Sequence, residues 1–223
     1  MSKKVFLSPS NQYDNVYAYG NTTEGVQCGK IADACKIALE RSGVDVMLMH
    51  DEDMQTKCAE SNKFGADLHV PIHTNAFNGK VMGTRMFCYN SGKGMAACKA
   101  IFARVAPLSP GTSENIQVNQ NLYEVRVPAA PTAYIECEFH DTVEGAKWIV
   151  ENTVLIGETI ARGICDYFGV TFKEPEQPKP AKPVTTGTLY RVQVGAFAVR
   201  ENAEKMLARL KAAGFEGFIR EGK

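Results

Sequence analysis

The sequence lacks an excess of charge of one sign and lacks any long apolar run. Lysine and arginine number 25, aspartate and glutamate also number 25, and the formal net charge is zero. Without a basic excess, bulk electrostatics gives no reason to expect nucleic-acid binding. The apolar run Val5-Phe6-Leu7 is too short for a signal-peptide core, and no stretch approaches the length of a membrane span. We therefore expect a soluble protein, without membrane insertion, that is synthesised in the cytoplasm without a classical signal peptide.

The sequence also lacks the closely spaced cysteine pairs of zinc fingers and redox sites. It has seven cysteines, an odd number, and no C-x-x-C pair. Several of them fall at apolar positions of expected helices and strands. We interpret them as buried free thiols of a chain made in a reducing compartment, with a zinc or disulfide cluster as the alternative. The seven are Cys28, Cys35, Cys58, Cys88, Cys98, Cys137 and Cys165.

Strand-like and helix-like patterns alternate along most of the chain. Short apolar runs predict strands, and apolar residues spaced three or four apart predict helices. The expected strands are 4–8, 44–49, 67–73, 81–89 and 131–138, and the expected helices are 24–42, 52–62, 93–106 and 143–168. Residues 111–120 are expected to form a polar loop, and 123–127 a short strand. This alternation predicts an α/β fold with a mostly parallel twisted sheet flanked by helices.

A proline-rich segment gives the clearest domain boundary. Residues 173–187 carry four prolines within nine positions and cannot pack a core, so we expect a solvated linker there. The segment separates a domain over 1–172 from a small α+β piece over 188–223. In that piece a β-α-β pattern is expected, with strands at 189–197 and 215–220. It is too short to bury a stable core alone, which leaves a fragment or an element that forms a homo-oligomer as interpretations.

The strand expected at 67–73 ends in polar residues. Side chains alternate along a strand, so Leu68, Val70 and Ile72 should face one side, and His69 and His73 the other. Ligands of open α/β sheets bind where the strands end, which makes His73 a candidate metal ligand. The alternative is a histidine whose hydrogen bonds are satisfied in the core or in a turn. We expect His69 to be structural.

Two further polar groups are expected at the same edge of the sheet. Glu24 follows a polar loop and begins a helix, while Glu136, Glu138 and His140 end another strand. Zinc binds imidazole and carboxylate, and a further carboxylate beside a zinc site can act as a general base. Each residue also has an ordinary structural explanation: Glu24 suits the positive end of a helix dipole, Glu136 could be a solvated strand end, and His140 could cap the next helix.

Three short segments carry a resemblance to a known family. They are Phe6-Leu-Ser-Pro-Ser-Asn-Gln, Pro71-Ile-His-Thr-Asn-Ala and Ala133-Tyr-Ile-Glu-Cys-Glu-Phe. From Val5 to Phe168 the chain resembles the zinc-dependent N-acetylmuramoyl-L-alanine amidases called Amidase 3. The resemblance implies hydrolysis of the amide between N-acetylmuramic acid and L-alanine in bacterial peptidoglycan. It also implies Zn²⁺ bound by Glu24 and His73, with Glu136 as the catalytic glutamate.

The chain departs from the family pattern at one zinc ligand. Asn11 stands where the family has its first zinc-binding histidine. His140, or the side-chain oxygen of Gln12 or Asn11, could be the third ligand. Asn11, Asn75 and Glu138 are candidate substrate-binding residues. The alternative is a non-catalytic peptidoglycan-binding protein derived from an amidase. The variant motifs resemble those of phage and prophage endolysins, so we expect a lytic enzyme that acts on the cell wall after release.

The end of the chain resembles part of another family. Tyr190-Arg-Val-Gln-Val-Gly-Ala-Phe, followed by Leu210-Lys-Ala-Ala-Gly-Phe, resembles the opening of a SPOR domain, which binds peptidoglycan. Only the first β-α-β of such a domain is present in this sequence. Tethering a wall-binding module to an amidase would raise the local concentration of its substrate.

Overall fold

The structure is a computed structural model that describes residues 2–112, 114–175, 192–212 and 214–221. The chain divides into two compact units, Met1–Glu176 and Gln177–Lys223. The boundary expected at residue 172 stays a prediction from the sequence. Each unit is described by itself below.

A six-stranded sheet forms the centre of the first unit. Its strand order is β2-β1-β3-β6-β4-β5. The first three pairings and the β4–β5 pairing are parallel, and only the β6–β4 pairing of this sheet is antiparallel. The predicted α/β fold with a mostly parallel sheet is therefore confirmed. The strands are β1 Lys4–Pro9, β2 Asp45–Leu48, β3 Leu68–Asn75, β4 Arg85–Cys88, β5 Asn115–Val118 and β6 Tyr134–Phe139.

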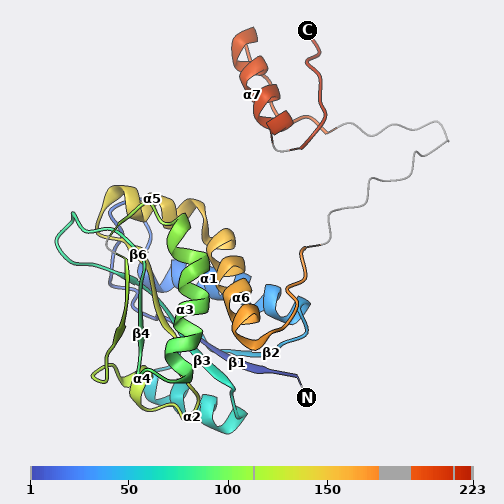
Figure 1. The fold of residues 1–223 in the computed structure, drawn as a ribbon. Helices are drawn as coiled ribbons and strands as arrows, with labels where there is room; N and C mark the ends of the chain where they lie inside the picture. Colours follow the sequence, from blue (N-terminus) through green and yellow to red (C-terminus); the bar gives the residue numbers. More distant parts are fainter. Residues whose placement is uncertain (1, 113, 176–191, 213, 222–223) are drawn as a thin grey trace. The chain divides into compact units, whose positions relative to one another are not determined.

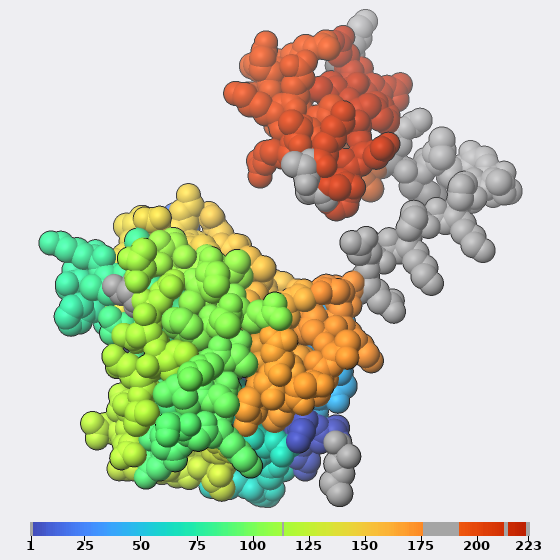
Figure 2. Space-filling model, in the orientation of Figure 1, coloured from blue at the N-terminus to red at the C-terminus, as the bar shows by residue number. Residues whose placement is uncertain are grey.

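Three helices cover one face of this sheet (Figure 1). Helix α6 packs against both α1 and α3, and Figure 2 shows α3 and α6 side by side on the near side of the molecule. The core lies between these helices and the sheet, where apolar side chains exclude water. The helices of the first unit are α1 Glu24–Arg41, α2 Met54–Phe64, α3 Lys93–Val105, η1 Ala106–Leu108, α4 Tyr123–Arg126, α5 Val143–Glu151 and α6 Thr153–Phe168.

The two faces of β3 differ as the sequence predicts. Leu68, Val70 and Ile72 are fully buried in the core beneath the helices. His69 points to the second face, where it contacts Ser61 of α2 and Glu124 of α4. These two helices therefore cover the second face around His69. Beyond them, towards the carboxyl ends of β1, β3 and β6, the second face carries polar side chains.

Two sequence predictions in the first unit are wrong. The stretch expected as a polar loop contains β5, because residues 115–118 pair in register with β4 at the edge of the sheet. The segment expected as a short strand is instead α4, which places Glu124 against His69 and Ser8. In both places tertiary contacts overrode weak local preference, as is common for four-residue elements.

The predicted long helix 143–168 is two helices. The break lies at Asn152, whose backbone is not helical and whose side chain donates to the carbonyl of Trp148. Asparagine competes in this way with the helical hydrogen-bond ladder. The predicted strand 81–89 is also shorter, because Gly83, with a φ of 134°, lies in the loop that precedes β4.

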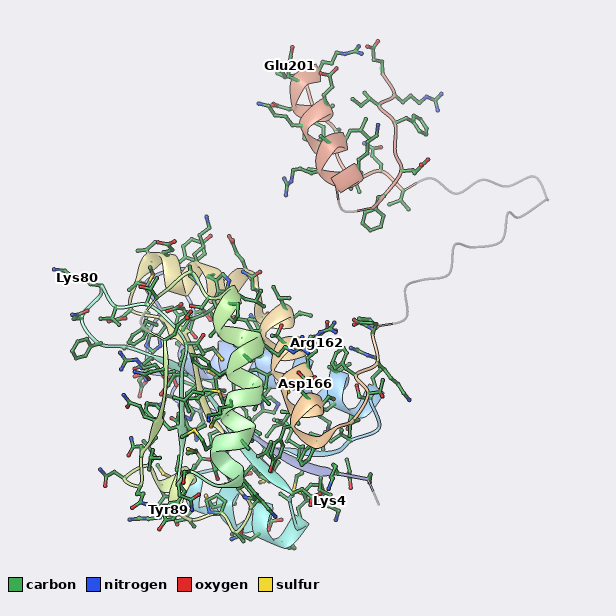
Figure 3. The ribbon with its side chains drawn as sticks, viewed as in Figure 1. Lys4, Lys80, Tyr89, Arg162, Asp166 and Glu201 are labelled. Carbon is green, nitrogen blue, oxygen red and sulfur yellow. The ribbon has the colours of Figure 1, made fainter. Side chains whose placement is uncertain are left out.

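A loop over residues 76–84 joins β3 to β4. Its backbone amides at Phe77 and Gly79 donate to a carboxylate oxygen of Asp141, at 2.9 and 2.8 Å. Lys80 projects away from the body of the unit (Figure 3). The loop is thus tied to the end of β6 at its base and reaches solvent at its tip.

Helices α1 and α6 approach closely at Gly157. A Cβ atom added there would lie 2.4 Å from the carbonyl oxygen of Ile31 and 2.7 Å from the Cβ of Ala34. We expect Gly157→Ala to lower the free energy of unfolding by about 1–2 kcal/mol, since overpacking outweighs the better helix propensity of alanine. Chemical denaturation would measure the change, with the exposed Val154→Ala on the same helix as the control. Unchanged or increased stability of Gly157→Ala would contradict the close approach.

The described part of the second unit contains helix α7, Arg200–Ala212. The predicted helix is therefore confirmed, whereas residues 192–197 and 215–220 carry no assigned strand. The first residues of the strand predicted at 189–197 lie outside the described residues. In the described chain, no helix combines the length and the apolar character needed to cross a membrane.

Candidate active site

Glu24 and His73 form the centre of the site. Glu24 is the first residue of α1, His73 lies near the end of β3, and His73 Nδ1 is 2.9 Å from Glu24 Oε1. The carboxylate is almost fully buried and the imidazole nearly so. Two residues that are 49 positions apart in the sequence thus meet at the edge of the sheet, as the candidate metal ligands were expected to do.

Two amides complete the surroundings of Glu24. Gln12 Nε2 lies 3.3 Å from Glu24 Oε1, the oxygen that also contacts His73. Asn15 Nδ2 donates to Glu24 Oε2 at 2.7 Å and to Gln12 Oε1 at 3.1 Å. The amide of Gln12 therefore lies directly beside the glutamate–histidine pair. Since an amide group can turn its oxygen or its nitrogen towards a neighbour, Gln12 can present either atom there.

The pair is electrostatically matched. Burial acts to lower the pKa of His73, but the hydrogen bond with Glu24 and the charges of Glu136 and Glu24 raise it above its ordinary value. Burial acts to raise the pKa of Glu24, but the hydrogen bond and charge of His73 lower it overall. Each member of the pair therefore favours the charged form of the other.

Glu136 lies next to His73 on the neighbouring strand. The two residues are register partners between β3 and β6, and Glu136 is in turn the partner of Arg85 on β4. Its Oε2 atom is buried and has no hydrogen-bond partner among the described residues. Burial, with the charge of Glu24, raises the pKa of Glu136 to about 7, although His73 and Arg85 oppose the shift. A carboxyl group with this pKa can both accept and donate a proton near neutral pH.

His140 is directed into a hydrogen-bonded cluster. Its Nδ1 lies 2.9 Å from Thr74 Oγ1, which also contacts the hydroxyl of Tyr17 at 2.8 Å, and its ring stacks on Tyr17 with centroids 4.9 Å apart. Burial lowers its pKa, so the imidazole is neutral at pH 7. Among the described residues, His140 does not form a cluster with Glu24 and His73 whose ligand atoms all lie within 4.8 Å of one another. One metal ion could not be held by these three side chains as they are placed here.

The three candidate substrate residues occupy different surroundings. Asn11 is exposed and donates to the carbonyl of Glu52 at 3.1 Å, so its amide is held by another loop rather than by Glu24 or His73. The side-chain oxygen of Asn75 accepts from the amide of Ala76 at the end of β3. Glu138 is fully buried and accepts from the backbone amides of Gly83 and Phe139, at 2.6 and 2.7 Å, and from the hydroxyl of Ser109. This geometry gives Glu138 a structural role and does not support its predicted contact with substrate.

A second group of potential metal ligands lies deeper. Cys58, His69 and Glu124 are buried, and their ligand atoms lie within 4.8 Å of one another. However, His69 already contacts Ser61 Oγ at 3.0 Å and Glu124 Oε1 at 3.3 Å through its two nitrogens. Burial, with the charge of Glu124, raises the pKa of the Cys58 thiol to about 12, which disfavours the thiolate that zinc binds. Hydrogen bonds within the protein therefore account for this group, as expected for a structural His69. All seven cysteines are free and buried, which confirms the prediction of buried free thiols.

Sequence reasoning missed three residues of the site. They are Asn15, which holds Glu24; Tyr134, whose ring stacks on His73 with centroids 4.7 Å apart; and Arg85, the register partner of Glu136. Tyr134 could have been found, because it lies two residues before Glu136 and must share its face of the strand. Arg85 could not, because nothing in the sequence shows that β4 pairs with β6 in the antiparallel sense.

The donor set fits a borderline divalent cation such as zinc. Nitrogen from His73, a carboxylate oxygen from Glu24 and an amide from Gln12 meet at one place, and the unpartnered Oε2 of Glu136 lies on the adjacent strand. Zinc in catalytic sites takes three protein ligands and leaves one position open. The side-chain oxygen of an amide is a weaker zinc ligand than imidazole, so we expect a site of lower affinity than one with two histidines.

Two family models and a curated relative match this chain. The family model Amidase_3, described as N-acetylmuramoyl-L-alanine amidase, matches residues 11–166, and a SPOR domain model matches residues 173–221. The sporulation-specific N-acetylmuramoyl-L-alanine amidase of Bacillus subtilis is 25% identical over an alignment of 224 positions that covers 97% of this chain and 84% of that protein.

Solved structures share the fold of the first unit. The catalytic domain of CwlV, from Bacillus (Paenibacillus) polymyxa var. colistinus, has a TM-score of 0.68 at 17% identity, over 76% of this chain and 99% of that one. Cwp6 from Clostridium difficile has a TM-score of 0.66 at 23% identity, over 75% of this chain and 29% of that one. The present chain therefore corresponds to only part of Cwp6.

Proposed function

The chain belongs to the Amidase_3 family of N-acetylmuramoyl-L-alanine amidases, and we propose that it works as a zinc enzyme with Glu136 as its general base and acid. The reaction adds water across the amide between the lactyl carbonyl of N-acetylmuramic acid and the nitrogen of L-alanine. The observation that carries the proposal is the unpartnered, buried Oε2 of Glu136 beside the Glu24–His73 pair.

Glu24, His73 and Gln12 are the residues that we propose to hold the metal. A zinc ion bound there would polarise the scissile carbonyl and lower the pKa of a bound water. Asn15 holds the second oxygen of Glu24, and Tyr134 stacks on the ring of His73, so both proposed ligands are fixed in orientation before the metal arrives. Asn11 stands at the sequence position of the family histidine, but in this proposal its neighbour Gln12 is the ligand.

Glu136 moves the proton in this proposal. Its Oε2 takes a proton from the attacking water and later donates it to the alanine nitrogen as the C–N bond breaks. A pKa near 7 suits both steps, because the group is then neither too weak a base nor too weak an acid. Burial of the carboxyl group is the cause of that pKa, and it requires the sheet and the loops to exclude water around β6.

Substitution of Gln12 tests the proposed set of zinc ligands. We expect Gln12→Ala to lower zinc affinity at least tenfold, since one of three protein ligands is lost, and Gln12→His to raise it above the natural chain. Competition with a fluorescent chelator would measure both affinities. His140→Ala is the matched comparison, and we expect it to bind zinc nearly as well as the natural chain.

The opposite result would reassign the third ligand. Loss of zinc in His140→Ala, with no change in Gln12→Ala, would contradict the proposed set. Amidase activity should disappear when the purified protein is treated with a chelator and return on addition of zinc. Activity that persists with no bound metal, as measured by elemental analysis, would reject the zinc mechanism as a whole.

The second unit is matched by the SPOR domain model, and its family function supports cell-wall binding. Such a module would hold the catalytic unit near its polymeric substrate. The non-catalytic alternative is not favoured, since Glu24, His73 and Glu136 are all present and brought together. The endolysin role, the homo-oligomer and the localisation after release stay predictions from the sequence.

A further inference from the structure

A single row of polar side chains crosses four strands of the sheet. In register, His73 on β3 pairs with Glu136 on β6, Glu136 with Arg85 on β4, and Arg85 with Asn115 on β5. Register partners point to the same face of a sheet, so these four side chains share the face of the candidate active site.

Three members of this row have unsatisfied polar atoms. Glu136 Oε2, Arg85 Nε and Asn115 Oδ1 are buried and have no hydrogen-bond partner among the described residues. Buried polar groups are nearly always paired in folded proteins, so three neighbouring exceptions point to a polar ligand rather than to chance. The proposed reaction explains the unpartnered oxygen of Glu136, but it does not explain the unpartnered atoms of Arg85 and Asn115.

Arg85 is held ready for an anion. Its guanidinium lies over the ring of Phe139, 5.2 Å from the centroid, and the residue makes no ion pair with the described part of the chain. A planar guanidinium matches a carboxylate better than it matches any other common group of a peptide. Asn115, one strand further, presents an unpartnered Oδ1, which accepts and so suits a peptide N–H of the same ligand rather than its carboxylate.

The chemistry of the substrate indicates which part of the peptidoglycan would contact Arg85. The glycan side of the scissile bond carries hydroxyl and N-acetyl groups, and its only carboxyl group, on the lactyl ether, is consumed in the amide. Free carboxylates belong to the stem peptide, on the alanine side. In the second stem residue, a glutamate linked through its side-chain carboxyl, the α-carboxylate is either free or amidated. Adjacent strands lie about 4.8 Å apart, so Arg85 is one short step from the carboxyl group that protonates the alanine nitrogen.

We propose that Arg85 binds the α-carboxylate of the second stem residue and makes the enzyme select stems in which this group is not amidated. The proposal rests on the function proposed above, because it uses the position of Glu136 at the scissile bond. It makes Arg85 a substrate-binding residue that has no part in the proton transfer.

The test compares two soluble muropeptides that differ only in that group, one with the free carboxylate and one with the amide. For the natural chain we expect kcat/KM to be about tenfold to hundredfold higher for the carboxylate form, the size of one charge-assisted hydrogen bond. Arg85→Gln should remove most of this preference by slowing the carboxylate form alone, and Arg85→Lys should keep part of it.

The matched control is Arg104→Gln. Arg104 lies on α3, away from the site, where it pairs with Asp166 at the surface, so its loss should change neither rate. The comparison within the natural chain needs no variant and remains informative if Arg85→Gln folds poorly. Equal rates on both muropeptides in the natural chain, or equal losses on both in Arg85→Gln, would overturn the assignment of Arg85 and leave the amidase function standing. Failure to release peptide from either muropeptide or from purified cell walls would reject the function itself, and the assignment with it.

Discussion

Glu136→Gln should lose at least a thousandfold in amidase activity while it keeps its zinc. Glutamine has nearly the shape of glutamate, but its amide can neither take a proton from water nor return one to the leaving nitrogen. Glu136 is not among the proposed ligands, so zinc content should be unchanged. Peptide release from purified cell walls and elemental analysis would measure the two quantities on one sample. Retained activity, or loss of zinc together with activity, would contradict the assigned role.

The same variant should be more stable than the natural chain in the absence of metal. The folded-state pKa of Glu136 is about 7, above its ordinary value of 4.5, so the folded protein holds a proton that the unfolded chain has already lost. This group therefore stabilises the fold least at high pH, and the natural chain loses stability as the pH rises from about 4.5 to 7. Glu136→Gln lacks this loss. Its advantage should grow over that interval to about 3 kcal/mol and stay constant above it. An advantage that shrinks with rising pH would contradict the burial of an uncompensated carboxylate.

Glu138→Gln should instead lower the free energy of unfolding by a large amount. The Glu138 carboxylate is fully buried and accepts from two backbone amides and from the hydroxyl of Ser109. A glutamine side chain there would lose the charge-assisted hydrogen bonds, and its NH₂ group would face N–H or O–H donors. We expect a loss of about 2–4 kcal/mol, or a melting temperature lower by roughly 5–12 °C. Thermal unfolding followed by circular dichroism would measure it.

The two variants form a matched pair. They make the same chemical change two residues apart on one strand, and the structure assigns opposite effects to them. Glu138→Gln that is as stable as the natural chain, yet impaired in substrate binding, would restore the role that the sequence suggested for Glu138.

The sequence predicts the centre of the site better than its edges. His73 and Glu136 could be placed because each ends an apolar strand, and the alternation of side chains determines the face of each. Arg85 and Glu138 could not, because their roles depend on β4 pairing with β6 and on the loop that packs against Glu138. Strand order and pairing sense are long-range properties that local periodicity does not contain. For the same reason α4 was expected as a strand, although its glutamate is needed against His69.

Gln12 illustrates a different limit. The loop after β1 indicated only that the family histidine was absent and that two amides followed each other at that point. Which of them turns towards Glu24 depends on the backbone of the loop, where the amide of Ser10 is bonded to Ile72 and Asn11 is held by Glu52. Two chemically similar neighbours thus receive different roles from a few backbone contacts.

The reversal of β4 has a practical consequence for protein engineering. Strand β3 is parallel to β6 and β4 is antiparallel to it, so β3 ends and β4 begins at the same end of the sheet. The loop over residues 76–84 therefore joins the two strands without a crossover helix. Its length can therefore change without moving any strand, provided that Gly83 keeps its bond to Glu138. Variants in which the exposed tip around Lys80 (Figure 3) is lengthened or exchanged would test this tolerance. The proton-transfer residue and the proposed metal ligands lie outside that segment.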